Sequence, residues 1–204
     1  MSTPDGLEGI IANPAAGKDI RRLIAHGATL DNQSKVSIIR RVAVGLGALG
    51  IGRVLLMPDE QHLAERAFRG LPRGAADVPA ADIVDMPVRG EPDDSRLAAA
   101  LMREAGAGCL VVLGGDGTVR MVAQGAGEVP ILAISSGTNN VLPSFVDGTT
   151  AGLAAAGLAL GLVHRGLGAR RHKRLTVHVD GAAVSDALVD VAALAGRFVG
   201  ARAV

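Results

Sequence analysis

The chain has 204 residues, a formal net charge of +1 and a hydrophobic fraction of 49%. This length fits one large domain, or one domain and part of another, and the apolar fraction is ample for a buried core. The near-neutral charge provides no field that attracts nucleic acid or anionic membrane, and three Phe without Trp or Tyr form no platform for base stacking.

Short apolar runs alternate with helical patterns up to about residue 165. Strands are predicted at Leu7–Ala12, Arg53–Met57, Asp82–Met86, Cys109–Leu113 and Pro130–Ile134. Apolar residues at steps of three or four predict helices at Ser34–Leu49, Glu60–Leu71 and Asp94–Ala105, a further helix beginning near Thr118, and a core helix at Ala151–Val163. This alternation indicates an open, parallel, Rossmann-like α/β sheet with helices on both faces.

The pattern changes after residue 165. Leu175, Val177 and Val179 alternate with polar residues, Asp180-Gly181 is a hairpin turn signal, and Ala183–Val191 is the expected returning strand. We therefore predict one α/β domain at 1–165 and the beginning of an antiparallel β-rich domain at 166–204. About 40 residues are too few for an independent sandwich, so we expect this second domain to be truncated.

The N-terminal sequence MSTPDGLEG carries acids and lacks the apolar core of a signal peptide. The apolar stretch at Ala151–Val163 is shorter than the ~20 residues that a spanning helix needs. A single cysteine, Cys109, excludes an intrachain disulfide and fits a reducing compartment. We expect a cytoplasmic homo-oligomer with no membrane span.

Two short motifs resemble nucleotide-binding loops but lack features that such loops require. Gly45, Gly47 and Gly50 match the dinucleotide fingerprint, but a helix precedes them and a strand follows, which is the reverse of the required order. They indicate a helix end and a turn. Residues 12–18 resemble a Walker A loop, but Lys18 is followed by Asp19 in place of the magnesium-binding Ser or Thr, which excludes a P-loop NTPase.

Three polar or glycine-rich corners follow predicted strands. They are Asn13–Lys18 after the first strand, Gly114–Thr118 after the fourth, and Ser135–Asn140 after the fifth. The carboxyl ends of parallel strands share one edge, where open α/β sheets bind ligands. Glycines there let backbone N–H groups approach phosphate, and Asp116 is suited to act as a general base or to bind the Mg²⁺ of a nucleoside triphosphate. The histidines show no zinc-binding spacing, so any metal is expected to arrive with the nucleotide.

The motif Gly-Gly-Asp-Gly-Thr at 114–118 is similar to the signature shared by NAD kinases, diacylglycerol kinases and sphingosine kinases. The stretches at 13–19, 57–59 and 136–140 resemble the ATP-NAD kinase-like AcoX proteins, which are associated with acetoin catabolism. The resemblance covers essentially the whole chain. It implies ATP with Mg²⁺ as the phosphoryl donor, NAD as the acceptor that becomes NADP, and nucleotides as the partners.

The resemblance also implies site residues. Asp116 is the implied catalytic base, and residues that share a place in the three corners are the implied nucleotide and phosphate ligands: Asn13, Gly17, Lys18, Gly114, Gly115, Gly117, Thr118, Gly137, Thr138, Asn139 and Asn140. Of the family's Asn-Asp/Glu motif only Asp190 is matched, because Val189 replaces the Asn.

The sequence departs from the NAD kinases in its third corner. Gly137-Thr138-Asn139-Asn140 is closer to the Gly-Thr-x-Asn of the lipid kinases than to the Gly-Thr-x-Gly-Phe of the NAD kinases. Two alternatives to an NAD kinase-like enzyme therefore stay open, a lipid kinase and a non-catalytic subunit that senses NAD or nucleotide.

Overall fold

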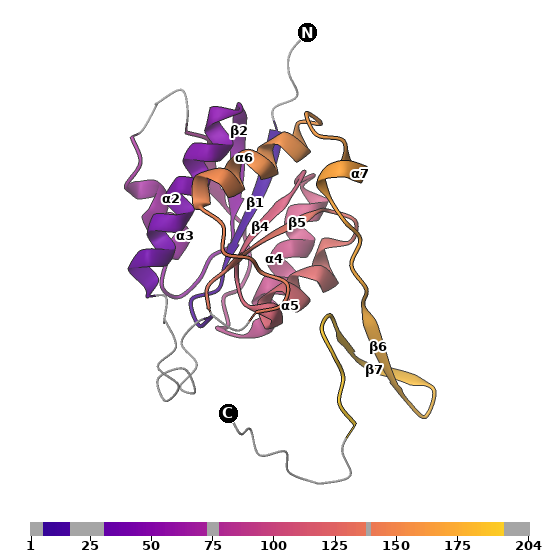
Figure 1. The fold of residues 1–204 in the computed structure, drawn as a ribbon. Helices are drawn as coiled ribbons and strands as arrows, with labels where there is room; N and C mark the ends of the chain where they lie inside the picture. Colours follow the sequence, from indigo (N-terminus) through magenta and orange to yellow (C-terminus); the bar gives the residue numbers. More distant parts are fainter. Residues whose placement is uncertain (1–5, 17–30, 73–77, 138–139, 194–204) are drawn as a thin grey trace.

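The computed structural model describes residues 6–16, 31–72, 78–137 and 140–193 (Figure 1). Its elements in chain order are β1 (Gly6–Ala12), α2 (Asn32–Ala48), β2 (Ile51–Leu56), α3 (Leu63–Arg69), β3 (Ala80–Ile83), α4 (Pro92–Glu104), β4 (Leu110–Gly114), α5 (Asp116–Ala126), β5 (Ile131–Ser135), α6 (Gly148–Ala159), α7 (Arg165–Gly168), β6 (Leu175–Val179) and β7 (Ala182–Ala187). The first five strands form one parallel sheet in the order β3-β2-β1-β4-β5. This confirms the predicted Rossmann-like α/β fold.

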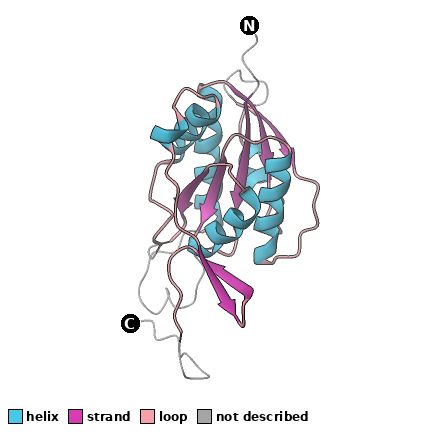
Figure 2. Cartoon of the chain, turned by 90° about the vertical axis from the view of Figure 1, so that its right-hand side faces the viewer, coloured by secondary structure: helices cyan, strands magenta, loops and turns pink. Residues whose placement is uncertain are grey.

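Helices cover both faces of the sheet, as Figure 2 shows. Alternate residues of β1 and β4 face opposite ways, so Ile10 and Val111 pack with α2, α3 and α6, whereas Ile11 and Val112 pack with α4 and α5. The two strands therefore lie at the centre of both cores, which explains why they read as continuous apolar runs.

The third strand lies two residues earlier than predicted. The structure places it at Ala80–Ile83 and not at Asp82–Met86, with Ile83 opposite Leu56 of β2. All four residues of β3 are exposed at the edge of the sheet. Because neither face is buried, the apolar pattern does not fix the register, which is set by pairing with β2.

Gly45, the first glycine of the apparent dinucleotide fingerprint, lies at a crossing of two helices, and Gly50 lies in the turn after α2 with φ of 88°. Gly45 lies within α2 and faces Gly152 of α6 at close range. A Cβ on Gly45 would collide with the carbonyl oxygen of Thr149, and one on Gly152 would collide with that of Val42. These glycines therefore allow α2 and α6 to pack, which agrees with the sequence-based rejection of a cofactor site.

Strands β6 and β7 form a separate antiparallel hairpin that projects beyond the carboxyl-end edge of the large sheet (Figures 1 and 2). Asp180 and Gly181 turn the chain with φ of 50° and 82°. Asp186 of β7 accepts hydrogen bonds from Arg120 and Gln124 of α5. The returning strand is shorter than predicted, because Leu188 leaves it and is buried in the core beside α4 and α5.

The described helices include none that is both long and apolar enough to cross a bilayer. The division of the chain into domains at residue 165 stays a prediction.

Candidate functional site

The register of the sheet brings the three predicted corners together. Ala12 is paired with Leu113, and Gly114 is paired with Ser135. Just past these pairs the Asn13 N–H donates to the Leu113 carbonyl at 3.1 Å, and the Ser136 N–H donates to the Gly114 carbonyl at 3.1 Å. The corners therefore leave β1, β4 and β5 side by side. The strand order reverses between β1 and β4, which is the point where open α/β sheets bind ligands.

A side-chain hydrogen bond joins the first corner to the glycine corner. The amide nitrogen of Asn13 donates to the hydroxyl of Thr118 at 2.9 Å. The other end of the same amide, its oxygen, accepts from the N–H groups of Ala15 and Ala16 at 2.8 and 3.3 Å. Asn13 thus shapes its own loop and holds the first turn of α5.

The glycine corner leads directly into α5, whose N-terminus is not capped by a side chain. The glycines on either side of Asp116 differ in their surroundings. A Cβ on Gly114 would lie 2.6 Å from Cβ of Thr118, so packing alone requires glycine there. A Cβ on Gly117 would meet no atom of the described residues within 4 Å. Gly117 therefore leaves open space over an electropositive helix end, a suitable place for an anion.

Asp116 connects the glycine corner to the third corner. One of its carboxylate oxygens accepts from the N–H of Leu142 at 2.8 Å, and the N–H of Val141 lies 2.9 and 3.1 Å from the two oxygens. A carboxylate can accept about four hydrogen bonds, so these contacts leave room for a further donor such as a substrate hydroxyl. Asp116 therefore has a structural role that the sequence did not indicate.

The third corner is held by polar side chains at its base. The hydroxyl of Ser135 donates to the Gly137 carbonyl and accepts from the amide of Asn140 at 2.8 Å. A Cβ on Gly115 would approach the amide oxygen of Asn140 to 3.0 Å, so this side chain lies against the glycine corner. The hydroxyl of Ser136, a residue only 2% exposed, has no hydrogen-bond partner among the described residues.

Lys35 of α2 is a site component that we did not predict. Its ammonium nitrogen donates to the carbonyl oxygens of Asn13, Pro14 and Ala16 at 3.0, 2.9 and 2.7 Å, and the residue is fully buried. The helical spacing could have indicated that Lys35 is buried. It stands four residues before Ile39 and seven before Val42, and it therefore lies on the same buried face of α2 as these two residues.

Asp59, at the end of β2, belongs to another of the corners quoted in the family resemblance. Its carboxylate accepts from the N–H groups of Gln61 and Leu63 at 2.8 and 2.9 Å and so caps the start of α3. Burial raises the pKa of this carboxyl above its usual range, and the two backbone hydrogen bonds partly oppose that shift. The capping of α3 therefore explains why an aspartate stands at position 59.

Asp190 is the remaining predicted residue that the structure describes, and it is not joined to these contacts. Asp190 is exposed and makes no hydrogen bond or ion pair with any residue that the structure describes. Gly17, Lys18, Thr138 and Asn139 lie outside the described residues.

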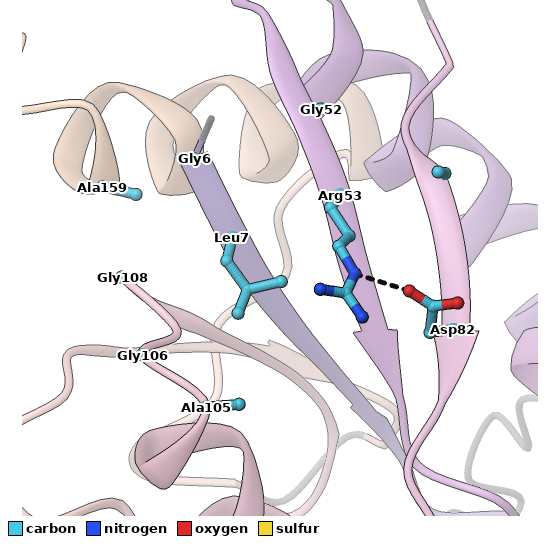
Figure 3. A pocket seen from close by; sticks show the side chains of 10 residues that line it. Gly6, Leu7, Gly52, Arg53, Asp82, Ala105, Gly106, Gly108 and Ala159 are labelled. Atoms are coloured by element: carbon cyan, nitrogen blue, oxygen red, sulfur yellow. Dashed lines mark hydrogen bonds and ion pairs between the residues drawn. The ribbon is translucent and has the colours of Figure 1, made fainter. Parts of the chain in front are cut away.

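A cavity of about 740 Å³ lies at the opposite end of the sheet, at the amino ends of β1, β2 and β3 (Figure 3). Leu7, Ala105 and Ala159 contribute apolar walls, and the charged side chains in it are Arg53 and Asp82, which form an ion pair with each other. These two charged groups are paired with each other, and the cavity lies at the end of the sheet opposite to the three corners, so its size does not make it the site.

Comparisons with known proteins identify the family to which the chain belongs. Residues 9–161 match the model of the ATP-NAD kinase N-terminal domain. The chain is 40% identical over 202 residues to acetoin catabolism protein X of Cupriavidus necator, covering 96% of this chain and 56% of that protein. The chain thus spans little more than half the length of that relative. No solved structure matches it. Because the family match includes all five strands of the parallel sheet except the start of β1, together with the three corners, the chain belongs to the ATP-NAD kinase family.

Proposed function

We propose that this chain binds ATP at the three corners and takes part in transfer of its γ-phosphoryl group to the hydroxyl of an acceptor, with NAD as the acceptor that we favour. The observation that carries the proposal is the open face at Gly117, at an uncapped helix N-terminus between Asn13 and Asp116. Phosphoryl transfer depends mainly on positioning and charge neutralisation, which such a cradle provides.

The proposed roles follow from the contacts. Backbone N–H groups in the first turn of α5 would bind phosphate oxygens, and the Asn13–Thr118 hydrogen bond would keep that turn in place. Mg²⁺ would enter with ATP and neutralise phosphate charge. Asp116 would accept the proton of the attacking hydroxyl while its hydrogen bonds to Val141 and Leu142 keep the third corner near the phosphates.

Family membership supports NAD as the acceptor. The relationship to a protein named for acetoin catabolism supports a place for this chain in the same metabolism. A sensor that binds nucleotide without turnover is the second candidate, because Asp190, the residue that matches the family's Asn-Asp/Glu motif, is exposed and makes no hydrogen bond or ion pair with the described residues.

The test is NADP formation from NAD and Mg-ATP by the wild-type chain, with the Cupriavidus necator relative assayed beside it. We expect NADP from both proteins. Mg-ATP binding by the chain without NADP formation, when the relative is active, would favour the sensor. If the chain binds neither ATP nor NAD, the proposed function is wrong.

Two variants separate the roles of Asp116. Asp116→Asn keeps an oxygen that can accept from Leu142 N–H but is a far weaker base, whereas Asp116→Ala also loses the anchor of the third corner. We expect Asp116→Asn to lower kcat by about 10²-fold or more with little change in ATP affinity, and Asp116→Ala to weaken ATP binding as well. Unchanged kcat in Asp116→Asn would exclude the proton-accepting role.

A further inference from the structure

Lys35 of α2 holds the first corner, the loop after β1, by hydrogen bonds. The side chain of Lys35 is buried. Its ammonium donates to three carbonyl oxygens that all belong to the loop after β1. An ammonium has three N–H donors and no acceptor, so the loop presents a matched set of acceptors. A buried charge is retained only where such partners replace water.

The position of Lys35 in its helix points to a role outside that helix. It is the fourth residue of α2, whose N-terminus is capped by the carboxylate of Asp31 accepting from Ser34 N–H at 2.6 Å. A cation in the first turn is opposed by the helix dipole. The hydrogen bonds to the loop oppose this unfavourable effect of its own helix.

The loop transmits this constraint to the candidate site. Lys35 binds the carbonyls of Asn13, Pro14 and Ala16, and the amide of Asn13 bridges from the same loop to Thr118 in the first turn of α5. The orientation of the Asn13 amide depends on the loop, because its oxygen accepts from Ala15 and Ala16 N–H. A continuous chain of contacts therefore connects the Lys35 ammonium to the glycine corner.

We propose that Lys35 is a positioning residue for the polyphosphate of a nucleotide. It fixes the first corner so that Asn13 can hold the N-terminus of α5. It also places a positive charge next to the carbonyl oxygens of that corner. It acts through Asn13 and does not touch the nucleotide. This proposal rests on the proposed function, since it assumes that a nucleoside polyphosphate binds at the three corners.

The test is calorimetric binding of Mg-ATP, and of tripolyphosphate as a probe without nucleoside, to wild type and Lys35→Met. We expect Lys35→Met to weaken both by roughly tenfold or more. In an Asn13→Ala background, Lys35→Met should weaken binding by less than about twofold further, because the bridge is already lost. Gly152→Ala, which disturbs the α2–α6 crossing, is the control for lost stability and should bind as wild type does.

The outcomes are distinguishable. Wild-type affinity in folded Lys35→Met would overturn the role of Lys35 and leave the proposed function standing. Fully additive losses in the double variant would show that Lys35 does not act through Asn13 and would overturn the proposal. If wild type binds neither probe, both proposals fail. Should Lys35→Met not fold, Lys35→Arg keeps the charge but cannot reproduce the three contacts, and wild-type affinity in it would equally overturn the proposal.

Discussion

Glu8 of β1 provides a quantitative test of the packing of the sheet. Its side chain is fully buried, and neither carboxyl oxygen makes a hydrogen bond of ordinary geometry with the described residues, although the nearby Cys109 backbone opposes part of the effect of burial on its pKa. Burial raises its pKa from 4.5 to about 9. The folded protein therefore keeps Glu8 protonated at pH 7, whereas the unfolded chain ionises it. One pKa unit corresponds to about 1.4 kcal/mol, so at pH 7 this difference costs about 3 kcal/mol of stability.

The sign of the pH dependence follows from the raised pKa. Below pH 4.5 Glu8 is protonated in both the folded and the unfolded chain, so its burial carries no ionisation cost. The free energy of unfolding then falls progressively as the pH rises from 4.5 towards about 9. Glu8→Gln has the same shape but cannot ionise, so it should match wild type at pH 4 and exceed it by about 3 kcal/mol at pH 7.

Urea denaturation of both proteins at pH 4, 7 and 9 measures this difference in the free energy of unfolding. Glu91→Gln, which neutralises an exposed carboxylate at the start of α4, is the matched control and should show no such trend. A difference between Glu8→Gln and wild type that does not change with pH would refute the reasoning.

Three further predictions concern packing and reactivity. Gly114→Ala places a methyl group 2.6 Å from Cβ of Thr118 and should lower the free energy of unfolding by about 1–3 kcal/mol in urea; an unchanged midpoint would contradict the packing of this corner. Gly152→Ala should destabilise by a similar amount because its Cβ would overlap the Val42 carbonyl, and a stabilised variant would show that α2 and α6 do not cross this closely. The Cys109 thiol is 1% exposed and its pKa is raised by burial and by neighbouring Glu8, so a disulfide reagent should label it in urea but not in the folded state; rapid labelling without urea would place it outside the core.

The features that the sequence predicted well are those set by burial and by strand order. The apolar runs around Ile10 and Val111 predicted central parallel strands, and the placement of glycines after Leu113 predicted a corner at their carboxyl ends. Parallel strands end at a shared edge, so the convergence of the three corners was predictable in outline, whereas the adjacency of β1, β4 and β5, which lets Asn13 reach Thr118, follows from the order of the sheet.

Contacts between distant segments could not be predicted in the same way. The carboxylate of Asp116 binds backbone N–H groups of Val141 and Leu142, which any residue other than proline would provide. The described partners of the Lys35 ammonium are main-chain carbonyls, which no residue type marks in the sequence. Exposed β3 lacked the burial pattern that fixes a register.

The most direct test of the nucleotide site is the affinity for Mg-ATP of Gly117→Ala, compared with Gly157→Ala, by calorimetry. Both glycines lie in helices, and a Cβ on either meets no atom closer than 3.6 Å. Each change should therefore leave stability unchanged or raise it by up to about 1 kcal/mol. We predict that Gly117→Ala weakens Mg-ATP binding by roughly tenfold or more, because its methyl group occupies the space over the N-terminus of α5, and that Gly157→Ala binds as wild type does. Equal affinity in all three proteins would contradict a nucleotide site at the glycine corner.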